Sequence, residues 1–225
     1  MTSPESIQRV DRPPPGLAAS ILIAWIGFAV MTGLAMWNES RPGTPFDDPI
    51  LRHVPYVPSI ERWNYWIWVV PWLLGAGTLM VLDPREASRM WFNSGIVSVL
   101  RGVCVCLAGL GPVRGPDVNA HLAWDTSRWA DATLAILNPW SVFTADAAHV
   151  WLTKDTLFSG HTASTFLLVL HASGHPRLRM TLVALHLAIV ATVFLGHIHY
   201  SVDVVVAWIV TWLVYRCGRR LFPAA

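Results

Sequence analysis

Six long apolar segments, separated by polar connections, dominate the pattern of the chain. They are Leu17–Trp37, Tyr65–Leu82, Trp91–Leu110, Leu157–His175, Met180–Gly196 and Tyr200–Tyr215. A helix needs about 20 predominantly apolar residues to cross the hydrocarbon core of a bilayer, and these segments reach or approach that length. The pattern therefore predicts an all-α, polytopic membrane protein with six transmembrane helices.

The composition agrees with a membrane protein and narrows the possible partners. Charged residues make up 13% of the chain, about half the share that is usual in a soluble domain. The net charge of +2 comes with no basic run, so nucleic acid is not an expected partner. The three cysteines give no disulfide framework, and the histidines form no tight multi-ligand motif. We therefore expect no metal and no other cofactor.

The basic residues indicate how the segments are oriented. With the N-terminus inside, the inner segments are short and rich in arginine. The outer connections, at roughly 38–64 and 111–156, are long and mix their basic residues with many acids. By the positive-inside rule, both termini face the cytoplasm. We predict a flexible cytoplasmic tail over residues 1–16, a membrane catalytic domain over 17–216 and a short basic cytoplasmic tail over 217–225.

Two polar motifs at the edges of apolar segments carry the candidate chemistry. One reads Asp-Thr-Leu-Phe-Ser-Gly-His-Thr at residues 155–162, and the other reads His-Ile-His-Tyr-Ser-Val-Asp at residues 197–203. The predicted topology brings both motifs to the outer face. His199 and Asp203 are four residues apart, so on a helix they share one face. The carboxylate can then hold one imidazole nitrogen and leave the other free to act.

A second histidine, His161, stands at the start of another predicted helix. Ser159 can cap this helix, and Gly160 lets the backbone approach closely. Helix N-termini with free amides attract phosphate. An oriented histidine, a second histidine and an anion-binding helix end suit phosphoryl-type transfer through a histidine, with the second histidine as acid or base.

Other polar residues have two interpretations each. Arg101 lies near the middle of the third apolar segment, a costly position unless it faces a polar interior. It either binds a phosphate or forms a structural pair with an acid from another helix. His197 either lines the site or lies at the membrane interface. Even His199 with Asp203 has the alternative of a helix-capping or packing pair.

The motifs resemble those of a known family. Residues 155–162 and 199–207 resemble the third and fourth motifs of the sphingomyelin synthases, which belong to the wider phosphatidic-acid phosphatase type 2 superfamily. Arg101, followed by Gly111-Pro112, resembles the arginine that precedes that family's Leu-Pro turn, and residues 42–48 after the first span resemble its first motif. The similarity runs in order from Arg41 to Tyr215, with the same six-helix layout.

The resemblance implies an activity. The family transfers a phosphorylated alcohol headgroup from a membrane phospholipid donor to ceramide, and releases diacylglycerol. Carried over, His199 takes the headgroup as the nucleophile, Asp203 orients it, and His161 serves as acid and then as base. The substrate-binding residues that we expect are Arg101, Asp155, Ser159, Gly160 and His197.

The chain also departs from the family pattern. Thr153-Lys154 stands where the animal enzymes tend to have Cys-Gly, and Ile198 stands where several of them carry an acid. The acid can contact a cationic headgroup, so choline, ethanolamine, inositol and glycerol all stay open. The acceptor is ceramide or a diacylglycerol-like alcohol, and the oligomeric state is left unassigned. The small size and the absence of appended domains favour a bacterial plasma membrane, with the site on the outer face (the lumenal face of the Golgi in a eukaryote).

Three functions compete at this stage. Hydrolytic members of the superfamily carry a basic first motif and a Ser-Arg pair upstream of the last histidine, whereas residues 191–196 here contain no arginine. A headgroup transferase is therefore preferred over a lipid-phosphate phosphatase or a phospholipase C-like hydrolase. The third possibility is a non-catalytic lipid-binding membrane protein, which the set of His161, His199 and Asp203 disfavours.

Overall fold

The structure of the chain is a computed structural model that describes residues 14–117, 119, 130, 134 and 152–222. Within these residues it contains helices and no strand, apart from one isolated bridge between Thr44 and Leu110. The α-helices are α1 (Leu17–Glu39), α2 (Pro58–Leu82), α3 (Pro84–Ala108), α7 (Gly160–His171), α8 (Pro176–Leu195) and α9 (Ser201–Leu221). Two 3-10 turns accompany them, η1 (Leu51–His53) and η2 (Ala172–Gly174). The predicted all-α class is confirmed.

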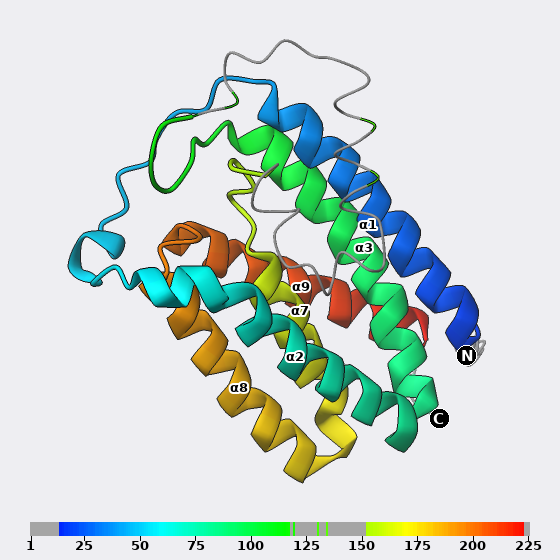
Figure 1. Cartoon of the computed structure of the whole chain (residues 1–225). Helices are drawn as coiled ribbons and strands as arrows, with labels where there is room; N and C mark the ends of the chain where they lie inside the picture. Colours follow the sequence, from blue (N-terminus) through cyan, green and yellow to red (C-terminus); the bar gives the residue numbers. More distant parts are fainter. Residues whose placement is uncertain (1–13, 118, 120–129, 131–133, 135–151, 223–225) are drawn as a thin grey trace, which may run out of the picture.

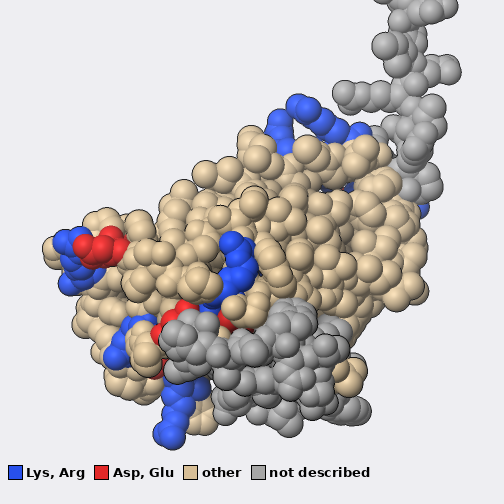
Figure 2. All heavy atoms as spheres, turned by 90° about the horizontal axis from the view of Figure 1, so that it is seen from above, with Lys and Arg blue, Asp and Glu red and all other residues tan. Residues whose placement is uncertain are grey.

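Five of these helices are long and apolar enough to cross a membrane: α1, α2, α3, α8 and α9. Each of them exposes large apolar side chains, and five that are more than half exposed are Leu22, Val81, Leu107, Leu187 and Ile209. Figure 2 shows that the described surface seen from above is mostly uncharged, with its charged side chains in a few groups. These features are consistent with a multi-pass membrane protein.

The fourth predicted span differs from the prediction. The apolar segment Leu157–His175 holds α7, a helix of only 12 residues. At 1.5 Å per residue it is about 18 Å long, less than the hydrocarbon core. Ser159 caps its start, and the backbone leaves the helix before His175, because a residue that precedes proline disfavours the α conformation. In Figure 1, α7 lies among α2, α3, α8 and α9, all of which it contacts, so protein rather than lipid surrounds it.

Helices α1 and α3 run side by side and make the most extensive helix contact (Figure 1). Glycines allow this close approach: a Cβ atom on Gly27 would collide with the backbone of Gly95, and a Cβ atom on Gly102 would lie 3.0 Å from the Cα atom of Met31. Small residues play this part in membrane helix pairs, where packing rather than the hydrophobic effect drives association.

The two ends of the helix bundle are formed by different segments of the chain. The start of α1 and the end of α9 lie near the turn between α2 and α3, whereas the segments that lead into α7 and α9 lie at the far end of the bundle (Figure 1). The last helix continues to Leu221, so residues 217–221 of the predicted C-terminal tail are helical. Residues 1–13 and 223–225 lie outside the described residues.

A buried polar network ties α3, α7 and α9 together near the chain ends. Glu86 of α3 accepts hydrogen bonds from Arg89, from Nη1 of Arg219 at 2.7 Å and from Nδ1 of His171 at 2.9 Å. The other ring nitrogen of His171 is 3.1 Å from Nδ2 of Asn93. One carboxylate thus pairs with two guanidinium groups that come from different helices.

Glu86→Gln should therefore destabilise the fold strongly. The amide removes the negative charge that faces the buried Arg89 and the partly exposed Arg219, and breaking a buried ion pair such as Glu86–Arg89 costs about 3–5 kcal/mol. The free energy of unfolding in detergent micelles measures the loss. Asp47→Asn is the control, because the Asp47–Arg52 pair is exposed and such pairs contribute about 0–1 kcal/mol. Equal losses in the two variants would contradict the network's importance.

Candidate active site

The start of α9 carries the predicted histidine–carboxylate pair. Nδ1 of His199 is 3.1 Å from Oδ2 of Asp203, and both residues are buried. The same carboxylate oxygen accepts the backbone N–H of Tyr200 at 3.0 Å, which is the N-cap of the helix. The carboxylate therefore holds the Nδ1 side of the ring, and Nε2 is the nitrogen that it leaves to react.

Asp203 also joins the two motifs to each other. Its Oδ1 accepts the N–H of Leu157 at 2.7 Å, and its backbone carbonyl accepts the N–H of Ser159 at 3.1 Å. Leu157 adopts a φ of 69°, in the left-handed region that a branched residue occupies only at a cost of about 1–3 kcal/mol. The strained backbone directs this amide at the carboxylate, so Asp203 organises both segments at once.

The start of α7 brings the second histidine to the first. Oγ of Ser159 accepts the N–H of Thr162 at 3.3 Å and so caps the helix as expected. His161 follows in the first turn, and its ring centroid lies 5.7 Å from that of His199 at an interplanar angle of 65°. The two predicted catalytic imidazoles are therefore neighbours in space although 38 residues separate them in the chain.

Arg101 lies against this helix start. Its guanidinium forms an ion pair with Asp155, and a Cβ atom on Gly160 would lie only 2.6 Å from its Nη1. The absence of a side chain at Gly160 is what lets the guanidinium reach the backbone. Nε of Arg101 and Oδ1 of Asp155 are buried without a hydrogen-bond partner among the described residues. Of the two interpretations of Arg101, the structure shows the pair with an acid, and the guanidinium lies beside the start of α7, which carries His161.

His197 has a different environment. Its Nε2 is 3.0 Å from the carbonyl oxygen of Val54, and its ring packs edge-on against Tyr56 at 5.6 Å. These contacts are with the connection between α1 and α2. The structure therefore brings together His161, His199, Asp203, Ser159, Gly160, Arg101 and Asp155, and it attaches His197 to the neighbouring connection instead.

Helix α2 supplies two site residues that the sequence reasoning missed. Nδ2 of Asn64 is 2.9 Å from Nε2 of His161, and the Trp68 ring lies 4.9 Å from the imidazole. The predicted span began at Tyr65, so Asn64 counted as part of the preceding connection. A polar amide four residues before a tryptophan at the edge of an apolar segment was the available signal, since the two share one helix face.

The connection after α1 packs against the start of α9 and hydrogen-bonds to it. Asp48 accepts the N–H groups of Ile50 at 2.8 Å, Leu51 at 3.2 Å and Ser201 of α9. Burial acts to raise the pKa of the Asp48 carboxyl, but these N–H donors outweigh it and hold the pKa below its usual value. The hydroxyl of Tyr200 accepts the N–H of Phe46 at 3.2 Å. Residues 42–48, which resemble the family's first motif, thus lie beside the last one.

Lys154, which stands where the animal enzymes tend to have glycine, holds the segment before α7 in place. Its side chain is 1% exposed, and its ammonium donates to the carbonyl oxygens of Glu39 at 2.8 Å and Arg41 at 2.7 Å and to Asp117 at 2.8 Å. The carboxylate of Glu39 in turn accepts the backbone N–H of Lys154 at 2.5 Å. These bonds hold the segment that runs into Asp155 against the end of α1.

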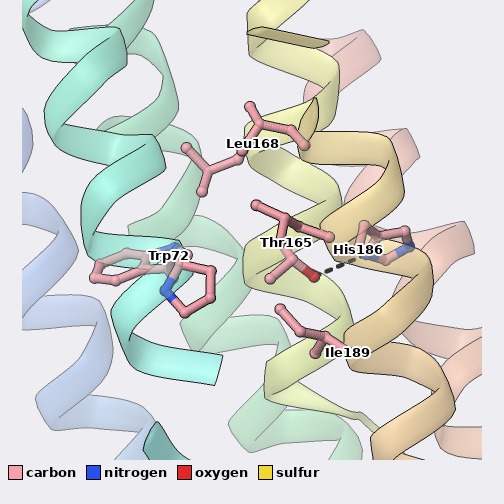
Figure 3. A pocket seen from close by; sticks show the side chains of 8 residues that line it. Trp72, Thr165, Leu168, His186 and Ile189 are labelled. Carbon is pink, nitrogen blue, oxygen red and sulfur yellow. Dashed lines mark hydrogen bonds between the residues drawn. The ribbon is translucent and has the colours of Figure 1, made fainter. Parts of the chain in front are cut away.

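An apolar pocket lies beside the site, between α2, α7 and α8 (Figure 3). Its lining residues are Pro71, Trp72, Thr165, Leu168, Leu182, Leu185, His186 and Ile189. Oγ1 of Thr165 is 2.7 Å from Nδ1 of His186 and 2.7 Å from the carbonyl oxygen of His161, one helical turn earlier. Trp208 donates to Nε2 of His186 at 2.9 Å, so the ring is held on both sides. The pocket thus adjoins the first turn of α7, and neither His161 nor His199 lines it.

Comparison with known protein families adds one match. Residues 154–219 match the family model described as PAP2 superfamily C-terminal. This segment contains α7, α8, all but the last two residues of α9, and both histidine motifs. The match supports the phosphatidic-acid phosphatase superfamily and is consistent with a lipid phosphatase or phosphotransferase, that is, with a membrane enzyme. No curated protein matches the chain.

Proposed function

We propose that the protein is a phospholipid headgroup transferase of the sphingomyelin synthase-like type. It moves a phospho-alcohol headgroup from a glycerophospholipid to ceramide or a related lipid alcohol, through a phosphohistidine-type intermediate, and releases diacylglycerol. The observation that carries the proposal is the pair of imidazoles 5.7 Å apart, one held by a carboxylate, beside a helix start that Arg101 approaches.

In the proposed mechanism, each of these groups has its own step. Nε2 of His199 attacks phosphorus, the bond to the diacylglycerol oxygen breaks, and His161 gives that oxygen a proton. The acceptor hydroxyl then attacks phosphorus, passes its proton to His161 and releases His199. Asp203 keeps Nδ1 of His199 as the hydrogen-bonded nitrogen through both steps, which stabilises the positive charge on the substituted ring. Splitting the transfer into two displacements is the advantage of a covalent intermediate.

The charge at the site favours a phosphodiester donor. A terminal phosphate carries up to two negative charges and calls for several basic groups, whereas a phosphodiester carries one. Arg101 is a cation at the start of α7, and Asp155 already offsets it. Residues 191–196 contain no arginine. Both features support a transferase over a phosphatase.

The proposed partners follow from the resemblance to the sphingomyelin synthases. The donor is a membrane phospholipid, and the acceptor is ceramide or a diacylglycerol-like alcohol, both of which reach the site from the bilayer. We place the site on the outer face of a bacterial plasma membrane, in line with the arginine distribution.

An assay of purified protein in mixed lipid micelles tests the proposal. Fluorescent ceramide is supplied with phosphatidylcholine, phosphatidylethanolamine or phosphatidylinositol, and mass spectrometry identifies the products. We expect a phospho-headgroup on ceramide together with diacylglycerol. Diacylglycerol with a free phosphorylated headgroup, and untouched ceramide, would instead establish a hydrolase. Inorganic phosphate from phosphatidic acid would establish a phosphatase. Lipid association without turnover in any mixture would support a non-catalytic lipid binder.

A further inference from the structure

We infer that Asn64 is a positioning residue that holds His161 for proton transfer. The inference rests on the proposed function, in which His161 is the acid and then the base. Asn64 is fully buried on α2, and its Nδ2 is 2.9 Å from Nε2 of His161. The two residues are 97 positions apart in the chain, so the contact exists only because α2 packs against α7.

A second residue on the same face of α2, Trp68, also contacts the His161 imidazole. Trp68, one turn later on α2, packs its ring against His161 at 4.9 Å. Its Nε1 donates to Oγ of Ser164 at 2.8 Å, and this hydroxyl donates to the carbonyl oxygen of His161 at 3.3 Å. The ring is therefore held by an amide at one nitrogen and by an aromatic face, while its backbone is tied to the same helix.

An amide suits this role because it is neutral and offers both kinds of hydrogen bond. The Nδ2 group donates to an unprotonated ring nitrogen, and the same amide turned by 180° accepts from a protonated one. A carboxylate in this place, like Asp203 beside His199, would stabilise the protonated imidazole and so hold its proton. The two histidines thus have different partners that match different tasks. The charged and titratable groups near His161 include His199 and Arg101.

The chain contains a matched control for this inference. Asn93 on α3 is also buried, and its Nδ2 is 3.1 Å from Nε2 of His171 on the same helix α7. This pair has the same chemistry as Asn64 with His161. It belongs to the Glu86 network near the chain ends, away from the two catalytic imidazoles. Asn93→Leu therefore reports what the loss of a buried amide–imidazole bond does to folding alone.

The test compares two donors that carry the headgroup used by the wild-type protein. One is the natural glycerophospholipid, and the other is the p-nitrophenyl ester of the same phosphorylated headgroup. The diacylglycerol oxygen needs a proton to leave, whereas p-nitrophenolate is a weak base and leaves without one. For Asn64→Leu, we expect kcat with the natural donor to fall about 10- to 100-fold, with KM little changed. The initial release of p-nitrophenolate should stay near the wild-type rate.

The outcomes separate this inference from the proposed function. If Asn64→Leu lost the same rate with both donors, the amide would be merely structural and the inference would be overturned. The same would follow if Asn93→Leu slowed the natural donor selectively, as Asn64→Leu is expected to do. An unchanged kcat with the natural donor would also overturn it. A wild-type protein with no turnover would sink the proposed function itself.

A second variant covers the possibility that Asn64→Leu fails to fold. Asn64→Asp keeps the shape and can still bind the ring, but its carboxylate stabilises the protonated imidazole. The alkaline limb of kcat/KM against pH should therefore move to higher pH relative to the wild type. A folded Asn64→Asp protein with an unshifted pH profile would overturn the inference.

Discussion

His199→Ala is expected to abolish headgroup transfer, with kcat lowered by about 10⁴-fold or more. In the proposed mechanism, Nε2 of this ring forms the covalent bond to phosphorus. Removing the ring therefore eliminates the first step rather than slowing it. The fold should survive, because among the described residues the side chain hydrogen-bonds to Asp203, and the bonds of Asp203 to Leu157 and Tyr200 stay in place.

Two measurements check this expectation. The first is turnover with the natural donor. The second is covalent labelling: a donor with a radiolabelled headgroup, supplied without an acceptor, should label the wild-type protein and leave His199→Ala unlabelled. His175→Ala is the control, since His175 lies at the opposite end of α7, partly exposed and near Asp83. Transfer retained by His199→Ala would remove the phosphohistidine step.

Asp203→Asn is expected to lower kcat about 10³- to 10⁴-fold. One carboxylate oxygen faces the His199 ring and the N–H of Tyr200, and the other faces the N–H of Leu157. An amide can accept on one side only, so either orientation sets its NH₂ group against a donor. The ring of His199 loses its orientation, or the segment before α7 loses its anchor.

The same change should reduce the free energy of unfolding by about 1–3 kcal/mol, because a buried N–H is left without its acceptor. Measuring kcat per folded molecule separates the two effects. A stability loss with a normal kcat would identify Asp203 as a helix cap, the alternative that its spacing from His199 also allowed. Asp47→Asn, an exposed carboxylate, again serves as the control.

Much of the site was predictable because its key contacts are local. His199 and Asp203 are four residues apart, and although His199 precedes the N-cap Tyr200, the carboxylate that caps the helix start still meets its ring. Ser159 caps α7 through its own neighbours, so its role also depends only on nearby residues. His197 shows the limit of this reasoning. It stands two residues from His199, yet a φ of 48° turns the backbone there, and its ring contacts Val54 instead.

The sequence by itself determined the helices and the local pairs of this protein. Apolar segments in lipid must satisfy their backbone hydrogen bonds internally, so hydropathy indicates where the long helices lie, although not their exact ends. Only the tertiary structure decided which distant residues meet. The packing of α2 against α7 brings Asn64 to His161, the close approach of α3 sets Arg101 on Gly160, and surrounding helices let α7 stay short. These contacts join residues tens of positions apart, and no local preference encodes them.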